Sequence, residues 1–485
     1  MSEQKERSMK EITPKGDDYS QWYLDVVLKA ELADYGPVKG CMVIRPYGYA
    51  IWEAMQQDMD RRIKETGHVN AYFPLLIPKS FLEKEKEHVE GFSPECAWVT
   101  IGGGAELEEP LAIRPTSEAM ICSMYAKWVN SWRDLPILIN QWANVLRWEK
   151  VTRPFLRTTE FLWQEGHTLH ATYEEAEEET LKMLHVYRSF SEEILAMPVV
   201  WGQKSDTEKF AGAQKTYSIE ALMGDGKALQ AGTSHNLGQH FATAYEISFL
   251  DKNQQRSLPW STSWGTSTRM IGGLIMTHGD DNGLILPPRV APYQVVIVPI
   301  PPRKGDVNEA VLPKAREVQA ALRAAGIRVH LDDRDTQLPG FKYADWEMRG
   351  VPLRLELGPK DLEKDQCVLV RRDNREKSFV PLAGLATVVR EKLDTLQKDL
   401  LERARKFVAD STTHVKTYDE FKQVMADKRG FIVTGWCRTA ECEAKIKEET
   451  KATVRVIPLE GEAVAGACVR CGQPSAREVY FAQAY

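Results

Sequence analysis

A cluster of prolines divides this chain more sharply than any other feature of the sequence. The segment Leu286–Pro292 reads LPPRVAP and holds three prolines within six residues. Proline has no backbone N–H with which to continue a helix or a central strand, so the segment indicates a linker. The chain has 485 residues, and a domain typically has roughly 100–200. We therefore predict three domains, spanning residues 1–288, 289–395 and 396–485.

The segment after the linker alternates between strand and helix patterns, which indicates a compact α/β domain. Apolar residues at helical spacing between Ala310 and Ala325 end at Gly326, a typical helix stop. A second helix is expected at Tyr343–Arg349. Strands are expected at Val295–Ile300, Ile327–Leu331, Leu353–Leu357 and Cys367–Val370. A long helix with interspersed charges, Leu385–Ala409, then leads to the third domain.

Composition sets only wide limits on function. Apolar residues make up 43% and charged residues 27%, which is typical of a globular protein, and the net charge is −6. This mild acidity does not exclude RNA, because binding needs only a local basic surface, and basic residues outnumber acidic ones from Arg289 to Lys377. We expect no membrane helix, because no run of about 18 apolar residues occurs. The charged first segment does not resemble a secretory signal, so we expect a cytoplasmic protein.

Four of the eight cysteines lie in the last domain and have the spacing of a metal site. Cys437 and Cys442 form a C-x4-C pair, and Cys468 and Cys471 form a C-x2-C pair after a gap of 25 residues. Two such pairs can bring four thiolates to one tetrahedral Zn²⁺. Four cysteine ligands leave no open position, so the predicted role of the metal is structural. The alternative is four ordinary reduced cysteines.

Two segments carry residues suited to a nucleotide triphosphate. Arg147 and Glu149 lie two apart on an expected strand, and Arg157 and Phe161 follow after a loop long enough to fold back between antiparallel strands. Guanidinium groups hold phosphates, and an aromatic face suits a purine. Further on, the Ser- and Thr-rich run Trp260–Arg269 ends in an arginine before an expected helix. Taken alone, the first segment could be a surface ion pair and the second an ordinary loop.

In this order the segments resemble the signatures of the class II aminoacyl-tRNA synthetases. Arg147 to Phe161 matches the second signature, and Trp260–Arg269 resembles the third, although Thr and Ser replace some of its usual glycines. The first signature, a helix and a strand ending in proline, fits Tyr47–Gly67 followed by Ala71–Pro74. In that class this element forms a dimer interface, so the resemblance implies a homodimer.

Three further motifs resemble those of the prolyl-tRNA synthetases, a family within this class. They are R-P-T-S-E at Arg114–Glu118, F-L-W-Q-E-G-H at Phe161–His167 and G-T-S-H at Gly232–His235. The four C-terminal cysteines and a final Tyr485 fit the archaeal/eukaryotic type. No large insertion separates the second and third signatures, so the resemblance implies a form without an inserted editing domain. The resemblance covers the chain from about residue 15 to its end.

The resemblance implies an antiparallel-sheet catalytic domain, an α/β anticodon-binding domain and a small α/β zinc domain. It implies catalytic roles for Arg147 and Arg269. The ATP-binding residues would be Arg147, Glu149, Arg157, Thr158, Phe161, Gln230, Thr233, Ser267 and Arg269. The proline-binding residues would be Thr116, Glu118, Arg147, Trp163, Glu165, His167 and His235. The anticodon-binding residues would be Glu347, Arg354 and Lys360, and the zinc ligands would be the four C-terminal cysteines.

The implied activity is the ATP-dependent attachment of L-proline to tRNA(Pro) through prolyl-adenylate, with release of AMP and diphosphate. Mg²⁺ would accompany ATP, with Glu149 and Gln230 as candidate ligands. The Tyr485 carboxylate would reach toward the active site. Three alternatives stay open at this point: a non-catalytic synthetase-like protein, a class II enzyme of another specificity, and an amino-acid ligase that uses no tRNA.

Overall fold

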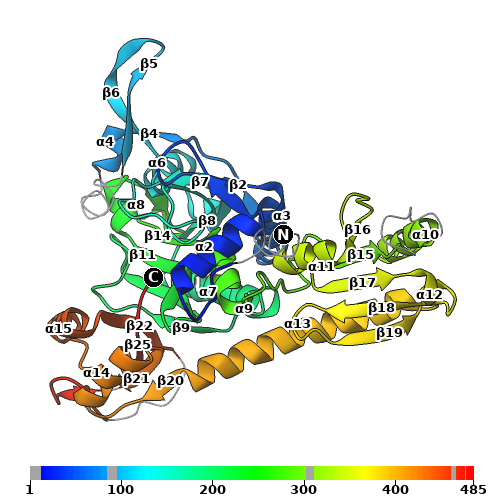
Figure 1. The fold of residues 1–485 in the computed structure, drawn as a ribbon. Helices are drawn as coiled ribbons and strands as arrows, with labels where there is room; N and C mark the ends of the chain where they lie inside the picture. Colours follow the sequence, from blue (N-terminus) through cyan, green and yellow to red (C-terminus); the bar gives the residue numbers. More distant parts are fainter. Residues whose placement is uncertain (1–11, 85–95, 302–310, 460–465, 476) are drawn as a thin grey trace.

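The computed structural model describes residues 12–84, 96–301, 311–459, 466–475 and 477–485 (Figure 1). A large mixed sheet contains strands from the N-terminal part and from the C-terminal part of the chain, and a second sheet forms a separate unit. Among the described residues, no helix is both long and apolar enough to cross a lipid bilayer.

The central sheet has eleven strands. Every neighbouring pair is antiparallel except the outermost pair at each edge. In spatial order the strands are β20 (Thr412–His414), β21 (Phe431–Gly435), β25 (Glu478–Gln483), β22 (Ala452–Pro458), β9 (Val199–Gln203), β10 (Lys215–Leu222), β11 (Ala228–Gly238), β14 (Trp260–Ser267), β8 (Glu160–His170), β7 (Ile137–Leu146) and β3 (Val69–Asn70).

Helix α7 (Tyr173–Glu193) covers one face of this sheet. The candidate functional cavity lies on the opposite face. Thr172 caps the helix by accepting a hydrogen bond from the backbone of Glu175. Met183, Leu184 and Tyr187 recur at helical spacing and are buried against the sheet. Helices α2 (Tyr19–Lys29), α3 (Pro46–Glu65) and α9 (Arg269–His278) complete the same core.

The elements predicted after the linker are confirmed with small shifts at their ends. The second sheet has the order β16 (Val329–Leu331), β15 (Val295–Pro299), β17 (Leu353–Leu357), β18 (Gln366–Arg371) and β19 (Lys377–Pro381). Strands β16, β15 and β17 are mutually parallel, β18 is antiparallel to β17, and β19 is antiparallel to β18. Its helices are α10 (Val311–Ala324), α11 (Pro339–Met348) and α12 (Pro359–Leu362).

Helix α13 (Leu385–Asp410) runs from this second sheet to the C-terminal unit (Figure 1). The proposed boundary between residues 395 and 396 lies inside this helix. The C-terminal unit adds α14 (Tyr418–Asp427) and α15 (Ala440–Thr450), and its strand β22 pairs with β9 through Ile457 and Pro458. The backbone ladder of the central sheet therefore continues into the C-terminal unit.

Two of the predicted strand assignments are wrong. Strand β7 ends at Leu146, so Arg147 and Glu149 lie in the loop after it and not on one strand face. The sheet ladder before Pro74 is limited to Val69–Asn70, and Ala71–Pro74 lies outside it. The predicted fold-back of the chain between antiparallel strands is confirmed, because β7 and β8 pair directly.

The smaller elements lie around the central sheet. A three-stranded sheet of β4, β6 and β5 ends in a hairpin that projects from the molecule (Figure 1). The remaining strands and helices are β1 (Ala33–Tyr35), β2 (Met42–Ile44), β4 (Leu76–Pro78), α4 (Lys79–Leu82), β5 (Ala97–Gly102), β6 (Ala105–Ile113), α6 (Glu118–Trp128), η2 (Trp132–Asp134), α8 (His240–Ala244), β12 (Phe249–Leu250), β13 (Arg256–Ser257), β23 (Gly466–Ala467) and β24 (Pro474–Ser475).

Candidate active site

A cavity of about 170 Å³ lies on the open face of the central sheet, over β8, β11 and β14. It is lined by most of the residues that the sequence predicted for proline and ATP. These are Thr116, Glu118, Arg147, Phe161, Trp163, Glu165, His167, Gln230, Thr233, His235, Ser267 and Arg269. Segments far apart in the sequence therefore meet in one place.

The antiparallel register arranges the floor of the cavity in rows. His235 of β11, Ser263 of β14 and His167 of β8 lie directly opposite one another across the three strands. The next row has Thr233, Gly265 and Glu165 in the same order. Directly paired residues share a sheet face, so both rows point into the cavity. Gly265 leaves the middle of its row without a side chain.

A β-bulge brings Gln230 onto this face. Side chains alternate along a strand, so Gln230 and Thr233, three residues apart, would otherwise lie on opposite faces. The register of β10 against β11 shifts at this point: Ile219 pairs with Gly232, and Glu220 pairs with Gln230. Ala231 is the extra residue. Such a bulge changes the direction of one side chain without ending the strand.

Glu165 is the centre of a buried hydrogen-bond network at one end of the cavity. It accepts hydrogen bonds from Ser117 Oγ and from Gln141 Nε2, the latter at 2.8 Å, and it lies 2.9 Å from His167 Nε2. Thr116 Oγ donates a hydrogen bond to Glu118 beside this network. These contacts fix the orientation of two carboxylates at the buried end of the cavity.

The pKa values of the two histidines of the cavity are shifted in opposite directions. Burial opposes protonation of His167, but its hydrogen bond to Glu165 and the nearby Glu118 raise its pKa above the ordinary value. Burial lowers the pKa of His235 to about 4. His235 therefore stays neutral at pH 7, and its Nδ1 lies 3.0 Å from Thr216 Oγ1. The buried end thus combines acidic groups with one neutral imidazole.

The opposite end of the cavity carries guanidinium groups and an aromatic ring. The Arg147 guanidinium lies 5.5 Å from the ring centroids of both Phe161 and Trp163, and its Nε donates to the backbone oxygen of Pro115 at 3.0 Å. Arg269 begins helix α9, and its Nε donates to Leu156 O at 2.9 Å. Burial, together with the nearby Arg147 and Arg157, lowers the pKa of Arg269 to about 10. Anions would relieve this crowding of positive charge.

Three predicted ATP residues lie outside the cavity lining. Arg157 Nε and Glu149 Oε2 form an ion pair of 2.7 Å across the loop between β7 and β8. Thr158 is buried, and its hydroxyl donates to Glu160 O at 2.8 Å. These residues lie in the loop that borders the site, and they do not line the cavity.

Sequence reasoning missed several residues of this site. Phe210 lines the cavity, and its ring lies 4.6 Å from that of His235, but no motif surrounds it. Ser263 also lines the cavity. The only signal for its role is that it pairs with His235 and His167 across the sheet. Trp163 Nε1 and Ser263 Oγ are buried and have no hydrogen-bond partner among the described residues. A bound ligand would supply such partners.

Comparison with known proteins gives the site its family. The chain matches models described as a class II tRNA synthetase core domain at residues 98–278, an anticodon binding domain at 294–392 and a prolyl-tRNA synthetase C-terminal domain at 418–485. It is 58% identical to proline–tRNA ligases of Natranaerobius thermophilus and Clostridioides difficile, with 100% of each chain covered. The chain belongs to the prolyl-tRNA synthetases.

A solved prolyl-tRNA synthetase has the same overall fold. It comes from Cryptosporidium parvum and was crystallised with halofuginone and AMPPNP. The similarity has a TM-score of 0.94 at 42% identity, and it covers 99% of this chain and 100% of the other. As a prolyl-tRNA synthetase, the chain is an enzyme that attaches proline to tRNA. The alternatives of another specificity and of a ligase without tRNA are thereby set aside.

Two of the residues predicted to read the anticodon are in direct contact, and the third lies in the same domain. Arg354 of β17 donates to Glu347 of α11 at 2.9 Å and to Glu356 Oε1 at 2.9 and 3.0 Å. Its guanidinium also lies 4.1 Å from the ring centroid of Tyr343. Lys360 is exposed at the short helix α12 of the same unit.

The four predicted metal ligands also come together. The Sγ atoms of Cys437, Cys442, Cys468 and Cys471 lie within 4.8 Å of one another. Four sulfurs around one Zn²⁺, each about 2.3 Å from it, are separated by about 3.8 Å. The donor set and the spacing therefore fit a structural zinc ion.

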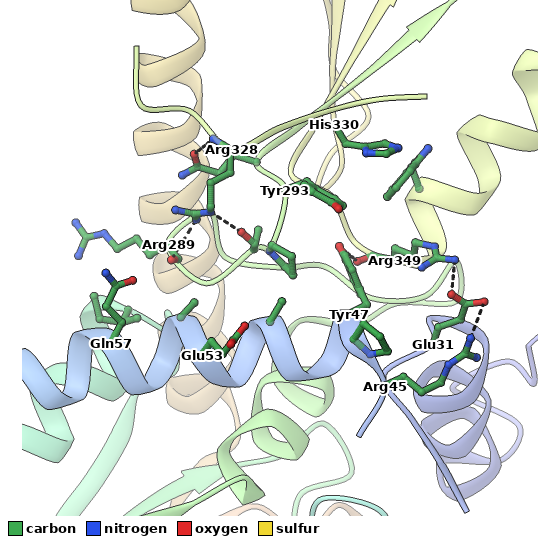
Figure 2. A pocket seen from close by; sticks show the side chains of 18 of the residues that line it. Glu31, Arg45, Tyr47, Glu53, Gln57, Arg289, Tyr293, Arg328, His330 and Arg349 are labelled. Atoms are coloured by element: carbon green, nitrogen blue, oxygen red, sulfur yellow. Dashed lines mark hydrogen bonds and ion pairs between the residues drawn. The ribbon is translucent and has the colours of Figure 1, made fainter. Parts of the chain in front are cut away.

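A larger cleft of about 1470 Å³ lies away from this chemistry, between α3 and the second sheet (Figure 2). Glu53 and Gln57 of α3 point toward it from one side, and Arg289 and Arg328 lie on the other. It contains none of the residues predicted for proline or ATP. Its size therefore does not make it the catalytic cavity, and the small cavity on the sheet remains the candidate site.

Proposed function

We propose that this prolyl-tRNA synthetase forms prolyl-adenylate in the cavity on the central sheet and then transfers the prolyl group to tRNA(Pro). The observation that carries this proposal is that the two ends of one continuous cavity differ in charge. Acidic and aromatic groups lie at its buried end, and Arg147 and Arg269 lie at its other end. An amino acid and a nucleotide triphosphate can thus meet between the two ends.

The buried end suits proline. The secondary ammonium of proline needs hydrogen-bond acceptors and negative charge, which Thr116, Glu118 and Glu165 offer. Its ring is apolar, and Trp163 and the neutral His235 give it flat surfaces. The unpartnered Ser263 hydroxyl in this end is a further polar group for the ligand. His167 also lines the cavity, and its Nε2, 2.9 Å from Glu165, orients that carboxylate.

The other end suits ATP. Phe161 offers a ring for stacking on adenine, and Gln230, Thr233 and Ser267 offer polar contacts along the nucleotide. Arg147 would bridge the proline carboxylate and the α-phosphate, and Arg269 and Arg157 would hold the outer phosphates. Glu149, which pairs with Arg157, would contact the adenine amino group, and Thr158 lies within the same loop. The Cryptosporidium parvum relative was solved in complex with AMPPNP, an ATP analogue, which supports ATP as a ligand of this enzyme.

The chemistry needs no covalent bond to the protein. In the first step a carboxylate oxygen of proline attacks the α-phosphorus, and diphosphate leaves. In the second step a ribose hydroxyl of the tRNA terminus attacks the prolyl carbonyl, and AMP leaves. The protein contributes position and positive charge, which stabilise the charge that develops on the phosphate oxygens. Arg147 is the residue closest to both reacting groups in this proposal.

Two metal ions belong to the proposal. Mg²⁺ would enter with ATP and be held mostly by phosphates and water, with Glu149 and Gln230 as candidate protein ligands. Zn²⁺ would be held by the four C-terminal thiolates and would cross-link that unit. A Cys468→Ser variant should lose the zinc found in the wild-type enzyme by metal analysis. Equal zinc content in the two proteins would contradict this ligand set.

We also propose that Glu347, Arg354 and Lys360 read the anticodon, and that the enzyme works as a cytoplasmic homodimer. Helix α3 borders the large cleft with a polar face, as Figure 2 shows for Glu53 and Gln57. A second chain would cover this face in the proposed dimer. Sedimentation equilibrium would give twice the mass of the chain, and a monomer mass at assay concentration would contradict the dimer.

One assay tests the central proposal. ATP–diphosphate exchange should be measured with each of the twenty amino acids. We expect the strongest signal with proline, with weak signals from cysteine and alanine because small apolar differences give only about 10- to 200-fold discrimination. An Arg147→Ala variant should lose the exchange. A stronger signal with any other amino acid, or full exchange by the variant, would overturn the assignment of this cavity.

A further inference from the structure

We infer that Phe379 is a stacking platform for an unpaired base of the tRNA anticodon loop. This inference rests on the proposed reading of the anticodon by Glu347, Arg354 and Lys360, and it adds a residue of a different chemical kind. Phe379 lies on β19, the edge strand of the second sheet, and 70% of its surface is exposed. Most of this residue's surface is therefore not packed against the chain itself.

The alternation of side chains puts Phe379 on the same sheet face as Arg354, the proposed anticodon residue of β17. Leu355, Leu369 and Val380 point into the core that helix α13 covers. Their neighbours along the three strands therefore point to the opposite face. On that face Glu356 pairs with Val368, and Val368 pairs with Phe379.

The register also sets the distance between these groups. Adjacent strands lie about 4.8 Å apart, so the Phe379 backbone is about 10 Å from that of Glu356, which accepts from Arg354. A few nucleotides of an unstacked loop can span this gap. In the neighbouring row, Arg354 pairs with Val370, and Val370 pairs with Lys377. The exposed Lys377 thus supplies a cation beside the ring, where the phosphates of such a loop would pass.

The chemistry of the row matches the way in which proteins read single-stranded RNA. Bases of an unstacked loop are held by aromatic rings and recognised by hydrogen bonds to their edges. Glu347, Arg354 and Lys360 would supply the polar contacts, and Phe379 supplies an aromatic face at the open edge. A ring stacks on every base, so Phe379 would add affinity for the loop and little discrimination between bases.

The test compares Phe379→Ala with wild type in tRNA charging and in ATP–diphosphate exchange. We expect kcat/KM for tRNA(Pro) to fall about 5- to 100-fold, as for the loss of a stacked base, and the exchange without tRNA to stay unchanged. Phe379→Trp should restore charging. Phe407→Ala is the matched control: this phenylalanine is also exposed, but it lies on α13 and lines a cavity that Leu222 of the central sheet also borders.

A scan of the RNA identifies the contact itself. Transcripts with one abasic nucleotide at each position of the anticodon loop are charged by wild type and by Phe379→Ala. At one position we expect the loss of the base and the loss of the ring to be non-additive, because either removes the same stack. Additive losses at every position would overturn the inference.

The variant Arg354→Ala separates this inference from the function on which it rests. Weaker charging by Arg354→Ala with normal charging by Phe379→Ala would overturn only the role of Phe379. Normal charging by both variants would instead overturn the proposed anticodon surface. A change in the sedimenting mass of Phe379→Ala with unchanged charging would show that the ring serves a protein contact, and it would also overturn the inference.

Discussion

At the scale of single residues, Glu165 determines the shape of the proline end of the cavity. It is buried and contacts Ser117, Gln141 and His167 at once. A buried network of this kind holds each member in one orientation only while all of its hydrogen bonds are formed. The proline contacts proposed for Thr116 and Glu118 lie directly beside it, so they depend on this residue for their position.

We expect Glu165→Gln to weaken proline binding selectively. Glutamine keeps the size of the side chain but removes the charge that pairs with His167, and hydrogen bonds to charged groups are worth about 1.5–3 kcal/mol. The KM for proline in ATP–diphosphate exchange should rise about 10- to 100-fold, with the KM for ATP changed much less. Equal increases in both KM values would mean that Glu165 supports the whole cavity and not its proline end.

Buried histidines give the enzyme a pH-dependent stability. Burial lowers the pKa of His170, His235 and His278 to about 4, whereas an unfolded histidine has a pKa of about 6.5. Between these values the unfolded chain binds more protons, so stability falls as the pH falls from about 6.5 toward 4. His167 acts in the opposite sense, because its raised pKa means that its contribution is lost as the pH rises through that value.

His278 allows this prediction to be measured away from the active site. Its Nε2 lies 2.8 Å from the backbone oxygen of Leu195, and it lies at the end of α9. We expect His278→Gln to reduce the loss of stability between pH 7 and pH 5 by on the order of 1 kcal/mol per pH unit below 6.5. Urea unfolding at several pH values gives this slope. An unchanged slope in the variant would rule out His278 as a source of the pH dependence.

At the scale of elements, the loop between β7 and β8 contacts residues from both the N-terminal and the C-terminal part of the chain. Tyr23 of α2 donates from its hydroxyl to Pro154 O at 2.7 Å, and the Arg153 guanidinium lies 4.9 Å from the Tyr23 ring. Arg153 also lies 5.8 Å from the ring of Tyr485, the last residue. Tyr485 itself is fixed by its backbone N–H, which donates to Ala228 O at 3.1 Å. This loop carries the proposed adenine and phosphate contacts.

We therefore expect the C-terminal residue to affect ATP binding. Deletion of Tyr485 removes both its ring and its carboxylate, and the KM for ATP in the exchange assay should rise several-fold. Tyr485→Phe keeps the ring beside Arg153 and the terminal carboxylate, so it should behave like wild type. Unchanged proline activation after the deletion would rule out a role for this residue in the site.

The elements also explain what the sequence could and could not predict. Motifs with fixed spacing, such as Phe161–His167, predicted the residues of the cavity because alternate positions on one strand share a face. The bulge at Ala231 and the contact of Phe210 with His235 depend on pairing between strands distant in sequence. Local periodicity contains no information about such pairing. The strand assignment of Arg147 failed for a related reason, because the register with β8 ends the ladder at Leu146.

At the scale of the whole molecule, the C-terminal unit is part of the catalytic sheet and not an appended module. Besides the β9–β22 pairing, a buried triad joins the two. Glu220 of β10 lies 2.7 Å from Lys204 and 2.8 Å from Arg455 of β22, and all three are nearly inaccessible to water. Burial opposes the charge of Glu220, but Arg455 and Lys204 lower its pKa and keep it ionised. Glu220 is also the cross-strand partner of Gln230.

This triad predicts an asymmetric response to mutation. Glu220→Gln leaves two buried cations without a counter-charge, and breaking a buried pair in this way costs about 3–5 kcal/mol. Arg455→Met removes one cation and leaves Glu220 paired with Lys204, so it should cost clearly less. Urea unfolding compares the two variants. Because Glu220 pairs with Gln230, Glu220→Gln should also raise the KM for ATP, whereas Arg455→Met should change it little. If Arg455→Met were the more destabilising change, packing between the units, and not charge balance, would be the dominant contribution to their connection.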